Sequence, residues 1–130
     1  MISVLTWPNA LAVAAGASGG ALLRWLAGVW LNDRWRGFPL GTLFVNCVGG
    51  LLIGMALLWF ERTPDERLRL FIVTGFLGGF TTFSAFSVES LIMLQRGELA
   101  LAMLHTVAHV AGALACAALG FRLAEAVFLR

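Results

Sequence analysis

Charge is scarce in this sequence: lysine is absent, and charged residues make up only 12% of the 130 residues. A soluble domain of this length needs more charged side chains to cover its surface. The nine arginines are scattered and form no basic tract, which argues against nucleic acid as a partner. We therefore expect a chain whose main solvent is membrane lipid.

Cysteine is equally scarce. Cys47 and Cys116 both lie within apolar runs. A disulfide or a metal pair is conceivable, but we favour small thiols buried at helix contacts. The sequence also has no linker and no internal repeat, so we predict one domain over residues 1–130.

Long apolar segments dominate the sequence, and 60% of the residues are hydrophobic. Four segments are near the ~20 residues that cross a bilayer as a helix. They cover residues 8–31, 41–60, 69–95 and 99–126. Short polar stretches connect them. The sequence therefore predicts an all-α, multi-pass membrane protein with four transmembrane helices.

The arginines of the loops are nearly balanced between the two sides of the predicted bundle. Five lie on the side of the termini and the second loop: Arg62, Arg67, Arg69, Arg122 and Arg130. Three lie on the other side: Arg34, Arg36 and Arg96. Because loop arginines set orientation, a weak bias allows insertion in both directions and an antiparallel homodimer. Near balance also occurs in proteins of fixed orientation, so the arginine pattern is compatible with a single orientation and with dual insertion.

The third predicted span contains an unusual stretch at 75–87, "GFLGGFTTFSAFS". Glycines beside hydroxyl residues favour a helix that breaks in mid-membrane, and irregular backbone survives there only inside protein or beside a cavity. Freed carbonyls at such a break can hold a cation such as Na⁺. The alternative is an ordinary helix, with the phenylalanines as packing and the hydroxyls bonded one turn back.

The other spans carry narrow stripes of small and polar residues at helical spacing. We interpret their glycines as close-packing seams between helices. Packing explains Arg24, Asn46 and the histidines less well. Arg24 lies either at a vestibule that attracts anions or close enough to snorkel to the interface. For His105 we favour packing, and for Glu89 the sequence leaves protonation, pairing and exposure open.

Three segments together resemble the Fluc (CrcB) family of fluoride channels over essentially the whole chain. They are "GASGGALLRWL" at 16–26, "GTLFVNCVGGLLIG" at 41–54 and "GFLGGFTTFSAFSVES" at 75–90. The resemblance implies a dual-topology, antiparallel homodimer in lipid, located in a bacterial inner membrane. It also implies no enzymatic activity, but passive export of fluoride along two pathways at the subunit interface.

The resemblance also implies roles for individual residues. Its pathway positions match Phe83, Phe86, Asn46, Thr42, Ser84 and, at a vestibule, Arg24. A structural Na⁺ at the dimer centre would be held by the backbone carbonyls of Gly78 and Thr81. On the fourth helix, where the family often carries serine, this chain has His109 and Ala113. A histidine can donate a hydrogen bond to an anion, so we place His109 on the pathway.

These residue types suit fluoride because it must lose a tightly held water shell. Amide and hydroxyl hydrogens can replace that shell, and phenyl rings present a positive edge without a fixed charge. Two alternatives compete with this interpretation. A proton-coupled multidrug exporter of similar size would use Glu89 as its membrane carboxylate. An intramembrane hydrolase would use Ser84 as nucleophile, with His105 or His109 as base.

Overall fold

The computed structural model describes residues 2–35 and 37–128. Arg36 and Arg130, which enter the arginine comparison above, lie outside them. After a short 3₁₀ turn, Ile2–Val4, the chain forms α1 (Trp7–Leu31), α2 (Leu40–Arg62), a composite third span and α6 (Leu99–Phe128). The third span consists of α3 (Glu66–Arg69), the π-helical η2 (Leu70–Leu77), α4 (Gly78–Phe80) and α5 (Phe83–Gln95).

The four predicted spans are confirmed, with ends that differ from the predictions by a few residues. Within the described residues, four helical segments are long and apolar enough to cross a membrane. Local signals explain where they begin and end. Pro8 lies in the first turn of α1, where a missing N–H is tolerated. Gly37 and Gly97 have φ angles of 79° and 74°, which the turns after α1 and α5 require.

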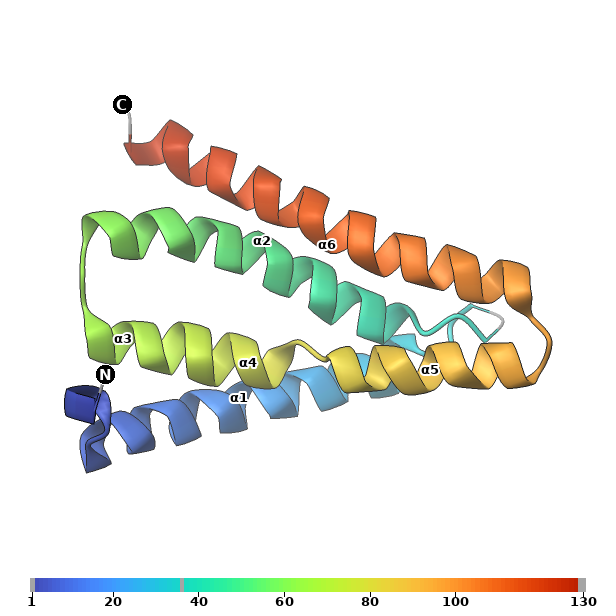
Figure 1. The fold of residues 1–130 in the computed structure, drawn as a ribbon, viewed down its shortest axis with the longest axis horizontal. Helices are drawn as coiled ribbons and strands as arrows, with labels where there is room; N and C mark the ends of the chain where they lie inside the picture. Colours follow the sequence, from blue (N-terminus) through green and yellow to red (C-terminus); the bar gives the residue numbers. More distant parts are fainter. Residues whose placement is uncertain (1, 36, 129–130) are drawn as a thin grey trace.

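The helices lie roughly along one axis in two pairs (Figure 1). α2 packs along α6, and α1 packs along η2 and α4. Both ends of the chain and the connection between α2 and α3 lie at one end of the bundle, and the other two connections lie at the opposite end. This is the arrangement assumed in the arginine comparison.

Glycines allow the close approach of helices in both pairs, as the sequence predicted. An added Cβ at Gly20 of α1 would overlap the carbonyl oxygen of Phe76 in η2. An added Cβ at Gly54 of α2 would overlap the carbonyl oxygen of Ala117 in α6. Backbone therefore meets backbone at both seams, which is how membrane helices gain packing energy without a hydrophobic driving force.

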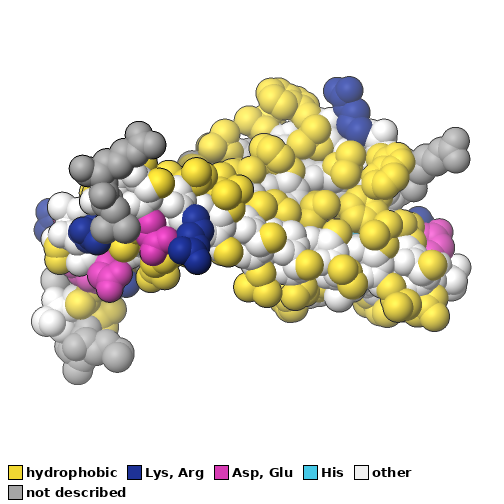
Figure 2. All heavy atoms as spheres, turned by 90° about the horizontal axis from the view of Figure 1, so that it is seen from above, with side chains coloured by type: hydrophobic (Ala, Val, Ile, Leu, Met, Phe, Trp, Pro, Cys, Tyr) yellow, Lys and Arg dark blue, Asp and Glu magenta, His cyan; other side chains and the backbone are white. Residues whose placement is uncertain are grey.

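Apolar side chains cover the outside of the bundle. Figure 2 shows a mostly hydrophobic face over the middle of the molecule, with charged side chains gathered toward its ends. Large apolar side chains such as Trp7 (85% exposed) and Leu114 (67%) point outward from their helices. An outward apolar surface of this extent matches lipid or another subunit rather than water.

We expect Gly20→Ala to destabilise the protein by about 1–3 kcal/mol, as overpacking typically does. Its Cβ would overlap the carbonyl oxygen of Phe76 and lie 2.7 Å from the backbone nitrogen of Phe80. The matched control is Gly19→Ala, whose Cβ would meet nothing closer than a Phe76 ring carbon at 3.9 Å. Thermal unfolding in detergent should show a lower midpoint for the first variant and an unchanged or higher one for the second. Equal unfolding midpoints for the two variants would contradict a close backbone contact between α1 and η2 at Gly20.

Candidate functional site

The third span is interrupted at two threonines between α4 and α5. Thr81 has φ −85° and ψ 160°, and Thr82 has φ −153° and ψ 119°, so both are extended. The Thr81 N–H still donates to the Leu77 carbonyl at 3.0 Å, which completes the first half of the span. The Thr82 hydroxyl accepts from the Ala85 N–H at 3.1 Å and caps α5. The predicted break is confirmed.

Asn46 of α2 hydrogen-bonds both backbone groups of Thr82. The Thr82 N–H donates to Asn46 Oδ1 at 2.8 Å, and Asn46 Nδ2 donates to the Thr82 carbonyl at 2.9 Å. The side-chain amide thus replaces the partners that a continuous helix would have supplied. In a lipid environment unsatisfied backbone groups are expensive, so this pairing makes an extended residue tolerable at that depth.

The break also releases carbonyl groups. In a continuous helix the Gly78 carbonyl would accept from the Thr82 N–H, and the Thr81 carbonyl from the Ala85 N–H. Asn46 and the Thr82 hydroxyl now hold those two N–H groups. The carbonyls of Gly78 and Thr81 are therefore left without their helical donors. The resemblance implies that these two carbonyls hold Na⁺, and that role stays a prediction.

Arg24 lies close to this break. Its Nε donates to the Gly79 carbonyl at 3.0 Å, and the side chain is half-buried. The guanidinium thus satisfies a third carbonyl that the missing helical turn would have used. Neither sequence interpretation of Arg24 predicted this contact. A vestibule location for Arg24 stays a prediction.

The two predicted pathway phenylalanines differ in environment. Phe83 is 78% exposed on the outside of this chain, whereas Phe86 is half-buried. Their ring centroids are 5.3 Å apart. Phe86 stacks on His105 with centroids 5.0 Å apart and lies 4.9 Å from the ring of His109. The pair therefore extends from the outer surface to the buried histidines.

A groove of about 440 Å³ lies beside the break. Its walls combine the break itself with side chains of α2, α5 and α6. They are Asn46, Thr81, Thr82, Phe83, Phe86, His109, Val110, Ala113 and Leu114. Four of the predicted pathway residues thus meet in one place. The other three, Arg24, Thr42 and Ser84, are not among its walls.

The two predicted hydroxyls have other partners. Thr42 is 5% exposed, and its hydroxyl donates to Glu89 Oε1 at 2.5 Å. Ser84 is exposed, with its Oγ 3.2 Å from the hydroxyl of Thr82. Thr42 thus belongs to a polar cluster deeper in the bundle, and Ser84 lies at the surface next to the break. A pathway role for either stays a prediction.

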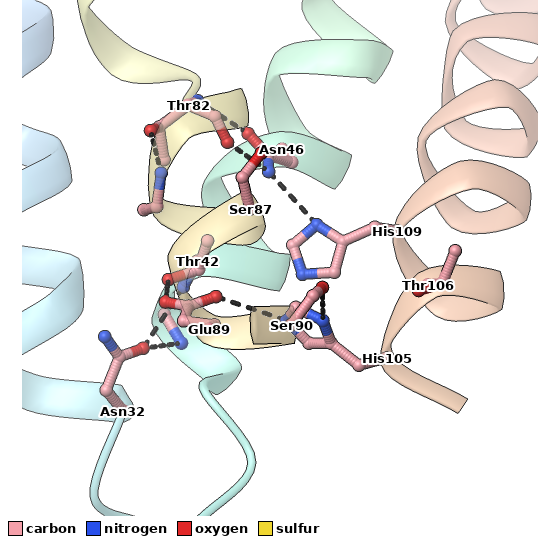
Figure 3. A network of polar contacts seen from close by, with 12 residues as sticks. Asn32, Thr42, Asn46, Thr82, Ser87, Glu89, Ser90, His105, Thr106 and His109 are labelled. Carbon is pink, nitrogen blue, oxygen red and sulfur yellow. Dashed lines mark hydrogen bonds and ion pairs between the residues drawn. The ribbon is translucent and has the colours of Figure 1, made fainter. Parts of the chain in front are cut away.

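The cluster around Glu89 is a feature that sequence reasoning missed (Figure 3). Glu89 Oε2 lies 3.2 Å from Nε2 of His105, which is fully buried, and His105 Nδ1 lies 3.0 Å from the Ser90 hydroxyl. His105 therefore has a polar role beyond the packing that we favoured, and Glu89 is paired. The four-residue spacing of His105 and His109 was the only signal in the sequence, because Glu89, which faces His105, lies on another span.

The fold and the groove together define a small multi-pass membrane protein with uncharged polar groups gathered at a break in one span. A family model described as "CrcB-like protein, Camphor Resistance (CrcB)" matches residues 11–121. The chain is 47% identical over 123 residues to the fluoride-specific ion channel FluC of Aromatoleum aromaticum, covering 93% of this chain and 94% of the relative. It is 50% identical over 121 residues to FluC of Bordetella petrii, covering 92% and 93%.

The chain belongs to the CrcB family. The resemblance seen in the sequence is therefore confirmed, and the multidrug-exporter alternative is wrong. The relatives are named as ion channels of bacteria, so the intramembrane hydrolase is also wrong. Four apolar spans and these relatives agree with a multi-pass protein of the bacterial inner membrane.

We expect Thr82→Ala to destabilise the protein by about 1 kcal/mol, because α5 loses its N-terminal cap. The hydroxyl of Thr82 is the group that accepts from the Ala85 N–H. Thr82→Ser keeps this oxygen and serves as the control. Thermal unfolding in detergent should rank the serine variant near the wild type and the alanine variant below both. An alanine variant as stable as the serine variant would show that the cap contributes nothing.

Proposed function

We propose that this protein is a fluoride-selective channel that lets fluoride leave the cell passively and so relieves its toxicity. The observation that carries the proposal is the groove beside the break. Among the described residues its walls contain an amide, two threonines, two phenylalanines and a histidine, and no Asp, Glu or Arg. The relatives named as fluoride-specific channels support the same ion for this chain.

The proposed pathway replaces water around fluoride with weak, uncharged contacts. The ring of His109 offers an N–H group, and the ring edges of Phe83 and Phe86 offer partial positive charge. The amide of Asn46 lies in the same wall and donates to the Thr82 carbonyl and to Nδ1 of His109. Ser84 and Arg24 would act beside the break but outside the groove, and Thr42 would act deeper in the bundle, next to Glu89. A fixed cation in the groove would bind fluoride too tightly to release it, and conduction requires release.

The exposure of Phe83 supports a second subunit. A groove on the outside of one chain has lipid as its other wall, and lipid offers no hydrogen-bond donors. We propose that an oppositely inserted copy supplies that wall, so that an antiparallel homodimer contains two pathways at its interface. The near balance of loop arginines fits such dual insertion.

The carbonyls released by the break support a structural Na⁺ at the centre of this dimer. Na⁺ is a hard cation that favours oxygen ligands, and Gly78 and Thr81 present carbonyl oxygens without their helical donors. Gly78 is also exposed on the surface of the single chain, where a partner can reach it. The bound ion would supply positive charge that joins the two breaks across the interface.

The decisive experiment is fluoride efflux from liposomes containing the purified protein, followed with a fluoride-selective electrode. We expect fluoride efflux and essentially no chloride efflux. Phe83→Ile removes a ring edge, and Asn46→Asp places a negative charge in the groove, so each should abolish or severely reduce the flux. Phe71→Ile, on η2 away from the groove, is the matched control and should conduct normally. Strong chloride flux, or fluoride flux indifferent to both groove changes, would contradict the proposal.

Dual topology predicts that each loop reaches both sides of the membrane. Glu98 is exposed in the connection between α5 and α6. In a background where Cys47 and Cys116 are replaced by alanine, Glu98→Cys should react with a membrane-impermeant maleimide to about half completion in intact cells. Permeabilised cells should then give full labelling. Complete or absent labelling in intact cells would mean a single orientation.

A further inference from the structure

The side-chain amide of Asn46 can adopt only one orientation. A backbone N–H can only donate a hydrogen bond and a carbonyl can only accept one. Because Oδ1 faces the Thr82 N–H at 2.8 Å and Nδ2 faces the Thr82 carbonyl at 2.9 Å, turning the amide over would lose both bonds. The extended backbone at the break therefore fixes where the amide hydrogens of Asn46 point.

This orientation determines which ring nitrogen of His109 carries the proton. Asn46 Nδ2 lies 3.1 Å from Nδ1 of His109, and an amide nitrogen has hydrogens but no lone pair to offer. Nδ1 must then be the acceptor, so it carries no hydrogen. The ring is accordingly neutral, with its proton on Nε2. A doubly protonated ring would place two N–H groups face to face.

The resulting Nε2–H group is a buried donor without an acceptor. His109 is 5% exposed, and within the part of the chain that the structure describes its Nε2 has no hydrogen-bond partner. Glu89, the nearest carboxylate in the cluster, already accepts from Thr42 at Oε1 and faces His105 at Oε2. Unsatisfied buried donors are rare enough that each needs an explanation.

A metal ion is one explanation, because Glu89, His105 and His109 each offer an atom within 4.8 Å of the others. A metal binds an imidazole nitrogen through its lone pair, however, and Nε2 of His109 carries the hydrogen. Moving that proton to Nδ1 would set it against the amide of Asn46. His105 is different, because its Nδ1 faces the Ser90 hydroxyl, which can donate or accept.

We propose that the backbone of Thr82, acting through Asn46, holds His109 as a neutral Nε2–H donor that binds fluoride on its way past the break. This inference rests on the proposed channel function and assigns Asn46 a positioning role toward His109. Phe86 lies against both histidine rings and lines the groove together with His109, so the ring of His109 borders the space that an anion would enter. The donor is then available to an anion small enough to enter.

The tautomer can be tested without any measurement of transport. NMR spectra of the full chain, labelled with ¹⁵N-histidine and placed in lipid nanodiscs, should show His109 protonated at Nε2 and unprotonated at Nδ1. A His105→Gln variant leaves one histidine and assigns the signals. Asn46→Asp offers a carboxylate oxygen to Nδ1 and should shift His109 toward the Nδ1–H form. A wild-type ring protonated at Nδ1, or a His109 signal displaced by added Zn²⁺, would overturn the proposal.

Fluoride binding is tested by matched substitutions of His109. His109→Gln keeps an N–H donor of similar reach, whereas His109→Leu fills similar space without one. Loss of a hydrogen bond to a charged partner lowers affinity roughly ten- to hundredfold, so we expect the leucine variant to lose flux by about that factor. The glutamine variant should stay within a few-fold of wild type.

The two tests separate this inference from the channel proposal. If the wild type passes no fluoride, the channel proposal fails, while the tautomer measurement still decides how Asn46 acts on His109. If the wild type conducts and the leucine variant conducts equally well, the channel stands and His109 is not a fluoride donor. Added sodium fluoride should move the Nε2–H signal of His109 in the wild type, and sodium chloride should not.

Discussion

The pairing of one side-chain amide with one backbone residue is the interaction on which this structure depends. A helix that breaks within lipid exposes N–H and carbonyl groups whose desolvation is expensive. Asn46 satisfies both groups of Thr82, and Arg24 takes the carbonyl of Gly79. The hydroxyl of Thr82 caps the helix that follows. The cap is local, but Asn46 and Arg24 belong to α2 and α1, so the break depends on the packing of the bundle.

The glycine seams make this assembly possible. Gly49 lies one turn after Asn46 on α2, and any side chain there would overlap the methyl group of Thr81. The bare backbone lets α2 approach the break closely enough for Asn46 to reach Thr82. On the other side, an added Cβ at Gly79 would overlap the carbonyl oxygen of Ala17, so α1 also lies against the break. The glycines therefore position the polar groups at the break, and they also allow the helices to pack closely.

The sequence predicted the parts of this structure that depend on composition and local pattern. Apolar length located the four spans, and the glycines beside hydroxyls located the break. It could not pair Thr42 with Glu89, which lie 47 residues apart, or Arg24 with Gly79. Such contacts depend on how far each helix is rotated and shifted against its neighbours. The sequence pattern does not determine this rotation and shift, because each helix carries more than one plausible polar face. They become fixed only when the helices pack together.

Glu89 shows how a carboxylate can lie near an anion route. The same cluster extends from Asn32, whose Oδ1 accepts from two N–H groups at the start of α2, through Thr42 to Glu89 and the histidines (Figure 3). One oxygen of Glu89 accepts from Thr42 and the other faces His105. Its lone pairs are thus directed at neighbours within the chain. The Nε2 of His109 has no hydrogen-bond partner among the described residues, so Glu89 leaves this donor unpaired although both belong to one cluster.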